Sequence, residues 1–329
     1  MPMSDADTQS PAAMNGNAVF DLQQLALVAV NGADAVDFLQ GQLTNDVRQV
    51  TDTRSQPSAW CSPKGRVLTD FLVLRHDGQL LLQLPQTLLQ ATLERMRMFV
   101  LRARVTLEDV SVSLRRLGVV GDGAESRLSD LFGPLPANTG VSRTREGITI
   151  VRLHGTRPRY EIIGSADALL PFERARLEIA PGAGVDAWTH LNIESGVAEI
   201  GPATSDAFVP QMINLDRIGG VSFTKGCYVG QEIVARTQHL GRIKRRMYRA
   251  HLSGGTPVIA GDTLKASTSA TPFSAQVVNA VPAPAGGFDL LTVIAIEQAE
   301  KLNDNGVTLD DGSRFSLQSL PYALEDETA

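Results

Sequence analysis

Residues 225–232 hold the densest group of chemically capable side chains in the sequence. They read K-G-C-Y-V-G-Q-E, so the thiol of Cys227 follows the cation Lys225 by two positions and directly precedes the phenol of Tyr228. If a helix begins at about residues 229–231, its unpaired N–H groups and Lys225 favour the thiolate of Cys227, the form that attacks electrophiles and binds metals. The alternative is a small buried cysteine at a strand-to-helix turn, which the residue type alone favours.

The elements that must position this segment show both strand and helix patterns. The apolar run at residues 25–30 predicts a buried strand. Residues 67–75 and 79–84 predict two strands, joined by a tight hairpin at the Asp-Gly pair between them. Apolar residues at helical spacing predict an amphipathic helix over residues 86–102.

The second half of the chain completes a mixed architecture. Strand patterns recur between residues 105 and 163, and helices are expected over residues 166–177 and after the N-cap residue Asp186. Because strict βαβ alternation is missing, we expect an α+β fold with largely antiparallel sheets. After Arg246, short β-prone runs between Gly-rich and Pro-rich turns predict a small β-barrel or sandwich. We therefore divide the chain into a disordered tail (1–17), an α+β region (18–240) with a second subdomain at about 112–180, and a C-terminal β-barrel (241–329).

The composition excludes several classes of protein. The 329 residues carry 30 basic and 36 acidic side chains, a formal charge of −6, which argues against a broad nucleic-acid surface. Only Cys61 and Cys227 are present, which excludes a disulfide scaffold or a zinc ribbon and fits a reducing, cytoplasmic location. The sequence leaves open whether the two cysteines approach each other as a redox pair. No apolar run reaches the roughly 18 residues of a membrane span, so we expect no membrane association.

Several segments together resemble one known family. Residues 225–232 match the K-G-C-Y-x-G-Q-E signature of the YgfZ-type folate-binding proteins, relatives of the glycine-cleavage T-protein. The resemblance extends over about residues 25–249, with further matching segments at residues 38–47, 63–66, 193–196, 210–215 and 240–242. It implies a T-protein-like three-part fold with tetrahydrofolate in a central cavity. It also implies a role in maintaining iron–sulfur enzymes, including enzymes that modify tRNA, as partners.

The resemblance also implies residues for a folate site. The acid that matches Glu194 in the T-protein pattern contacts the pterin, whose amino group and ring N–H can both donate to one carboxylate. Trp188, upstream on the same expected helix, can supply a flat wall. Read without the family, Trp188 is core packing and Glu194 a solvated residue. Folate ends in carboxylates, for which guanidinium groups are suitable partners. The other cofactor-binding candidates are Arg236, Arg242, Tyr228, Gln231, Glu232 and Asn214.

Three residues are candidates for catalysis. Where the T-protein carries paired aspartates, this sequence has Thr69-Asp70. Asp70 alternates with apolar residues, so it is either a proton-transfer group that faces the cavity or an ordinary polar residue on a strand. Cys227 and Lys225 complete the set. A thiol gained and an aspartate lost suggest chemistry other than glycine cleavage.

Three functions remain open at this point. The favoured one is a tetrahydrofolate-binding accessory protein that supports iron–sulfur cluster assembly or repair and thereby tRNA modification. The alternative is a folate-dependent aminomethyl or one-carbon transferase, in which Asp70 is required. Direct tRNA contact rests only on six basic residues, unaccompanied by acids, within residues 235–249, and it is the least favoured.

Overall fold

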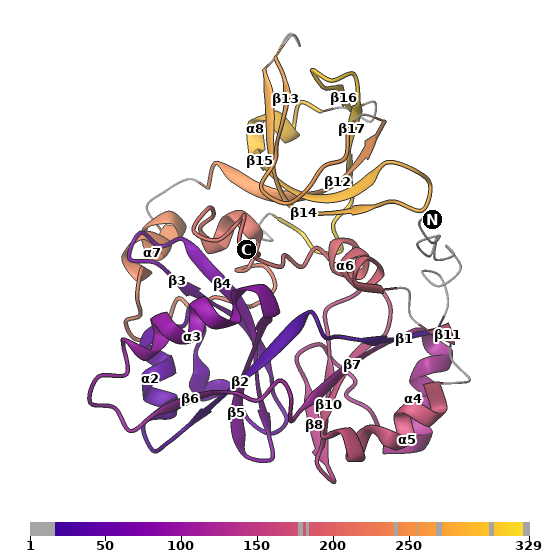
Figure 1. Ribbon diagram of the computed structural model, residues 1–329. Coiled ribbons are helices and arrows are strands. Elements are labelled where there is room, and N and C mark those ends of the chain that lie inside the picture. The colour runs from indigo at the N-terminus through magenta and orange to yellow at the C-terminus, as the bar shows by residue number, and fades with distance from the viewer. Residues whose placement is uncertain are drawn as a thin grey trace, which may run out of the picture.

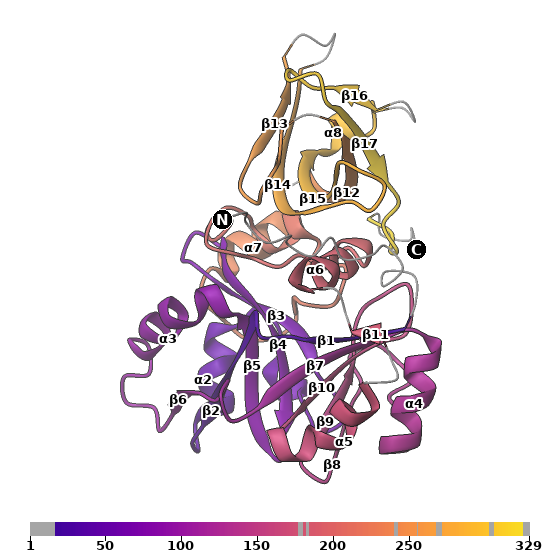
Figure 2. The same cartoon turned by 45° about the vertical axis from the view of Figure 1, so that its right-hand side comes forward.

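The structure is a computed structural model that describes residues 17–176, 180–181, 184–239, 243–254, 256–267, 272–302 and 306–324. The expected tail lies outside the described residues, apart from its last position, and Arg242 lies outside them as well. Three sheets form the molecule, and the third lies above the other two in both views (Figures 1 and 2). No helix among the described residues is long and apolar enough to cross a membrane.

The first sheet is five-stranded and antiparallel, in the order β3-β4-β5-β2-β6. The Asp-Gly hairpin is confirmed, because Asp77 and Gly78 both adopt positive φ between β4 and β5. Short helices cover one face of the sheet. The elements are β2 (Leu25–Asn31), α2 (Ala35–Gln42), η1 (Val47–Gln49), β3 (Gln56–Cys61), β4 (Val67–His76), β5 (Gln79–Pro85), η2 (Gln86–Leu88), α3 (Leu89–Arg97) and β6 (Thr106–Asp109).

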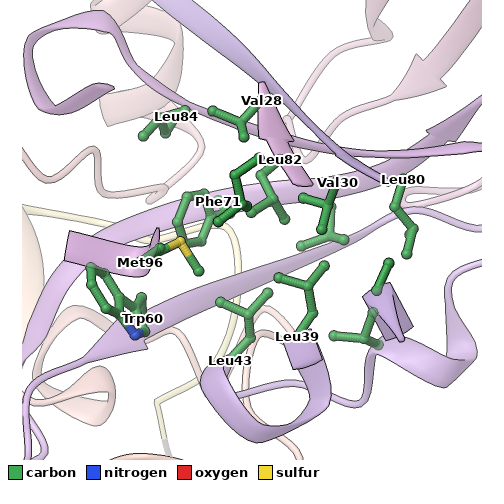
Figure 3. Packing of buried hydrophobic residues seen from close by; sticks show 14 of the residues in the cluster. Val28, Val30, Leu39, Leu43, Trp60, Phe71, Leu80, Leu82, Leu84 and Met96 are labelled. Atoms are coloured by element: carbon green, nitrogen blue, oxygen red, sulfur yellow. The ribbon is translucent and has the colours of Figure 1, made fainter. Parts of the chain in front are cut away.

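Strand β2 explains why its sequence is apolar at every position. Val28 and Val30 point into a core that α2 and α3 cover, together with Phe71 from β4 (Figure 3). Leu27 and Ala29 point the other way and pack against the second sheet. A strand buried on both faces has no place for the alternation of polar and apolar residues. The first sheet is thus held between its own helices and the second sheet.

The second sheet has six strands in the order β11-β1-β7-β10-β9-β8. All neighbours are antiparallel except β1 and β11. Strand β1 precedes the first sheet in the sequence but pairs here. The elements are β1 (Ala18–Asp21), β7 (Arg115–Val120), α4 (Asp122–Phe132), β8 (Ser142–Arg145), β9 (Ile148–Arg152), β10 (Arg159–Gly164), α5 (Ala166–Arg176), β11 (Ala180–Pro181) and α6 (Gly184–Glu194).

The third sheet is antiparallel and curls into a barrel-like body, in the order β13-β14-β15-β12-β17-β16. A connection containing η3 (Pro210–Ile213) and α7 (Gln231–His239) leads to it. The expected α+β fold with a small C-terminal barrel is confirmed. Its elements are β12 (Arg245–Ser253), β13 (Thr263–Ala266), β14 (Phe273–Pro282), β15 (Phe288–Ala295), α8 (Ile296–Ala299), β16 (Val307–Thr308) and β17 (Arg314–Gln318).

Buried polar contacts attach the third sheet to the rest of the molecule. Arg246 on β12 binds Asp216 through both guanidinium nitrogens, at 2.6 and 2.9 Å. Asp289 on β15 accepts a hydrogen bond from His190 of α6 and one from His251 of β12, at 2.7 and 2.8 Å. Charged groups that are buried need such partners, so these contacts hold the barrel in one position.

Candidate functional site

A cavity of about 130 Å³ lies where the first two sheets meet helix α6 and the connection to the barrel. Strands β4 and β5 form one wall and β9 and β10 another. Trp188 of α6 also lines the cavity, although it is 2% exposed and packs on Phe20 in a hydrophobic core. Trp188 fits there because Gly118 on β7 has no side chain. A Cβ at Gly118 would come within 2.4 Å of the indole. The guanidinium of Arg159 lies over the indole ring, 4.9 Å from its centroid.

Asp70 lies at this cavity, on the face of β4 opposite to the core residue Phe71. One of its carboxylate oxygens accepts a hydrogen bond of 2.8 Å from the backbone N–H of Ile200. Burial raises the pKa of Asp70 to about 6. Burial and the neighbouring Asp70 raise the pKa of Glu199 to about 7. Two carboxyl groups near neutral pKa in one cavity can hold and exchange a proton.

Glu199 was not among the residues expected from the sequence. It follows helix α6, and the side chain of Asn279 on β14 fixes its backbone. The N–H of Glu199 donates to Asn279 Oδ1 at 3.0 Å, and Asn279 Nδ2 donates to the carbonyl of Glu199 at 2.9 Å. The barrel therefore determines where this carboxyl group meets the cavity.

Strand β10 supplies a second charged pair, also absent from the sequence expectations. Arg159 and Glu161 are two positions apart, so they share one face of the strand, and both line the cavity. Gln83 of β5 donates from Nε2 to Glu161 at 2.9 Å. Burial raises the pKa of Glu161 to about 7 and lowers the pKa of Arg159 to about 10. His154 also lines the cavity, and burial lowers its pKa.

Glu194 does not line this cavity. Asn192 does, because it lies four residues after Trp188 and so on the same side of α6, whereas Glu194 is turned away. Glu194 lies 3.9 Å from Arg157 and 3.8 Å from His190, and about a quarter of its side chain is exposed. The structure thus brings Asp70 and Trp188 together and leaves Glu194 outside the cavity wall.

The signature segment, residues 225–232, packs elsewhere. Lys225 is buried, and its Nζ donates to the carbonyl oxygens of Leu43 and Asn45 at 2.7 and 2.8 Å. Burial lowers the pKa of Lys225 to about 8. Tyr228 is also buried, and its ring lies 5.2 Å from Lys225 Nζ. None of the described residues that line the cavity comes from this segment.

Gly230 explains how the signature segment meets the matching turn at residues 63–66. Its φ is +81°, and a Cβ there would lie 2.5 Å from the carbonyl oxygen of Ser62 and 2.9 Å from the Cα of Gly65. Helix α7 begins directly afterwards at Gln231, whose side chain accepts from the backbone N–H of Tyr228 at 3.3 Å. Only a glycine permits this close backbone approach.

Cys227 is exposed and unbonded, four residues before α7 begins. The alternative of a buried cysteine at this position is therefore wrong. Cys61 is the buried thiol, and burial raises its pKa to about 12. Lys225, the cation that the sequence placed beside Cys227, already donates hydrogen bonds to two backbone carbonyls.

The remaining candidates are dispersed. Glu232 and Arg236 are exposed on α7. Asn214 is fully buried with φ +57°, and it donates to the carbonyl of Met247 at 2.8 Å, which links the connection to the barrel. Arg246, one of the six basic residues on which the tRNA-contact alternative rests, is buried in its pair with Asp216.

The fold is that of the glycine-cleavage T protein. The structure superposes on the aminomethyltransferase T of the glycine cleavage system from Bartonella henselae with a TM-score of 0.72 and 17% identity, covering 93% of this chain and 86% of that one. Residues 5–142 match the family model described as the GCVT N-terminal domain.

Curated relatives define the family more narrowly. The tRNA-modifying protein YgfZ of Colwellia psychrerythraea is 30% identical over 321 residues, which is 93% of each chain. The protein of the same name from Klebsiella pneumoniae is 30% identical over 305 residues, again 93% of each. The chain belongs to the YgfZ family, and the resemblance drawn from its motifs is confirmed.

Proposed function

We propose that this protein binds tetrahydrofolate in the cavity and supports the assembly or repair of iron–sulfur clusters, and thereby tRNA modification. The observation that carries the proposal is the cavity itself, in which the indole of Trp188 lies beside buried charged groups. A flat heterocycle with a polar edge suits such a site. The relatives' name, tRNA-modifying protein, supports the second half of the proposal.

Each candidate residue except Glu232 and Arg242 has a part in this proposal. Trp188 stacks on the pterin, and Asp70 holds or transfers a proton at the reduced ring. Glu194 and Arg236 bind polar parts of the ligand that extend beyond the cavity. Cys227 presents its thiol to a client iron–sulfur enzyme. Other residues of the two matching segments support these groups from behind: Lys225, Tyr228 and Asn214, which are buried, and Gln231, which is half-buried.

The ligand is tested by titrating tetrahydrofolate into the protein and recording tryptophan fluorescence. The chain has two tryptophans, and Trp60 lies in the first core, where its Nε1 donates to Gln42. We expect Trp60→Phe to keep the ligand-dependent signal and Trp188→Phe to lose it. Calorimetry without heat of binding, together with unchanged fluorescence in the unmodified protein, would refute the folate site.

The thiol is tested in cells that lack the chromosomal copy of this protein. We expect Cys227→Ala to lose the iron–sulfur-dependent tRNA modification while its melting temperature stays unchanged, since the side chain is exposed. Normal modification by this variant would remove Cys227 from the mechanism. An exposed position makes unfolding a poor explanation for any loss.

A second candidate function, a folate-dependent one-carbon or aminomethyl transferase, is favoured by the position of Asp70 at the cavity. Purified protein with an aminomethyl-lipoyl carrier and tetrahydrofolate should then form methylene-tetrahydrofolate. Asp70→Asn should lower that rate at least 100-fold, the range that general acid–base groups contribute. Absence of product from the unmodified protein would exclude the transferase.

A further inference from the structure

Strands β5 and β10, on two walls of the cavity, carry polar atoms that no part of the described protein satisfies. They are Oε1 of Glu161, Oε1 of Gln83, and Nε and Nη1 of Arg159. All three residues are more than nine-tenths buried, and all three line the cavity. A buried donor or acceptor without a partner costs about 1–3 kcal/mol, so three such side chains around one cavity indicate a ligand site.

The unpaired atoms have a definite chemical pattern. Glu161 and Gln83 each offer an acceptor oxygen, and their side chains are joined by the 2.9 Å hydrogen bond. Arg159 offers donors two positions along the same strand. The complementary ligand edge carries two neighbouring N–H donors followed by an acceptor oxygen. A 2-amino-4-oxopyrimidine ring has this edge, with its amino group, ring N–H and carbonyl in that order.

The indole of Trp188 fits the same ligand. Arg159 lies over the indole and Glu161 lies two residues away, so the unpaired atoms and the flat aromatic surface belong to one corner of the cavity. A planar ring beside the Trp188–Arg159 pair can direct its edge toward β10. Glu194 lies outside the cavity wall and cannot make this contact from its observed position.

We propose that Glu161, Gln83 and Arg159 read the 2-amino-4-oxopyrimidine edge of the ligand, with Glu161 as the principal acceptor. This inference rests on the proposed folate site and assigns its pterin edge to β10 and β5 rather than to α6. The same edge occurs in guanine, so the chemistry alone admits pterins and guanine nucleosides. Binding requires Glu161 in its ionised form, because Oε2 accepts from Gln83 and Oε1 accepts from the ligand, so a proton on either oxygen would face an N–H donor.

The experiment measures dissociation constants by calorimetry for tetrahydrofolate, guanosine and inosine, which lacks the 2-amino group. We expect Glu161→Gln to weaken tetrahydrofolate binding at least tenfold, since an amide presents an N–H where the ligand needs an acceptor. Gln83→Met should weaken it severalfold. Glu108→Gln, the same change at an exposed position on β6, should leave affinity unchanged. Melting temperatures establish that each variant is folded.

The pH dependence is a second readout. Arg116 and Arg159 favour ionised Glu161, and Asp70, Glu199, His154 and Arg152 face the same space. Because the pKa of Glu161 is about 7, affinity of the unmodified protein should fall up to tenfold per pH unit below that value. The fall should be shallower in Glu161→Gln. An identical pH profile in that variant would overturn the assignment.

The outcomes separate this inference from the function on which it rests. If tetrahydrofolate binds and Glu161→Gln retains full affinity, the assignment is wrong while the folate site stands. Loss of binding in Glu194→Gln, with no loss in Glu161→Gln, would contradict it in the same way. If guanosine binds, inosine does not, and tetrahydrofolate does not, the edge is read as proposed and the folate proposal fails. If none of the three binds, both fail.

Discussion

The cavity wall and the signature segment differ in whether their buried polar groups have hydrogen-bond partners within the protein. In the signature segment, Lys225 and Gln231 form hydrogen bonds with the protein's own backbone, and Cys227 and Glu232 are exposed to solvent. In the cavity, Glu161 and Arg159 keep atoms unpaired although they are buried. The signature segment is the richest in chemically capable residues, yet most of it supports the sulfur atom of Cys227. The unpaired polar groups of the cavity come from strands whose sequences contain no comparable motif.

The largest expected change in stability tests whether the signature segment supports the fold. Gly230→Ala should destabilise the protein by about 3 kcal/mol, because its positive φ and the 2.5 Å approach to the Ser62 carbonyl exclude a Cβ. Urea unfolding measures this change. Gly226→Ala is the matched control, since a Cβ there meets nothing within 4 Å. Equal stabilities of the two variants would contradict the assigned packing.

A smaller effect of opposite sign is expected at the cavity wall. The pKa of Glu199 is about 7 in the folded protein, above the ordinary value of 4.5, so ionisation destabilises the folded state as the pH rises. Glu199→Gln should therefore stabilise the unliganded protein by about 1–2 kcal/mol at pH 8, after allowance for partial exposure.

This gain should largely disappear as the pH falls from 7 to about 4.5, where the carboxyl group is protonated in the folded state and half protonated in the unfolded state. Urea unfolding at pH 8 and at pH 4.5 provides the measurement. A stabilisation independent of pH would show that the charge of Glu199 does not destabilise the folded protein. The contrast between the cavity and the signature segment would then not hold for the cavity.

The smallest expected effect on stability concerns the exposed thiol of Cys227. Cys227→Ser should change the free energy of unfolding by less than about 0.5 kcal/mol, because the side chain is exposed. Cys61→Ser places a hydroxyl in a buried apolar position and should cost about 1–2 kcal/mol. Thermal unfolding of both variants checks the pair. A marked loss in Cys227→Ser would mean that this cysteine also supports the fold.

Local patterns predicted much of the fold. The doubly buried strand β2 and the Asp-Gly hairpin follow from a continuous apolar run and from turn chemistry. The helix expected over residues 86–102 is shorter, because α3 ends at Arg97 and the chain turns at Leu101, which has φ +47°. Its apolar periodicity continues through Val100, which still packs on the core without being helical.

The cavity was harder to predict because its polar residues come from separate strands. Asp70 and Trp188 could be found through the matching motifs, and both line the cavity. Arg159 and Glu161 did leave a signal, since two charges at alternate positions interrupt an otherwise apolar strand. Glu199 left none, because its place depends on Asn279, 80 residues later on the barrel.

Strand β1 has a consequence for how the chain reaches its final form. Residues 18–21 pair with β7 about a hundred positions later, and with β11 later still. Two of the four pairings in the first sheet, β3 with β4 and β4 with β5, join sequence neighbours, so that part of the sheet can assemble early. On the ribosome, β1 emerges before β7 and β11 and must wait unpaired until both have been synthesised, since non-local pairings form slowly.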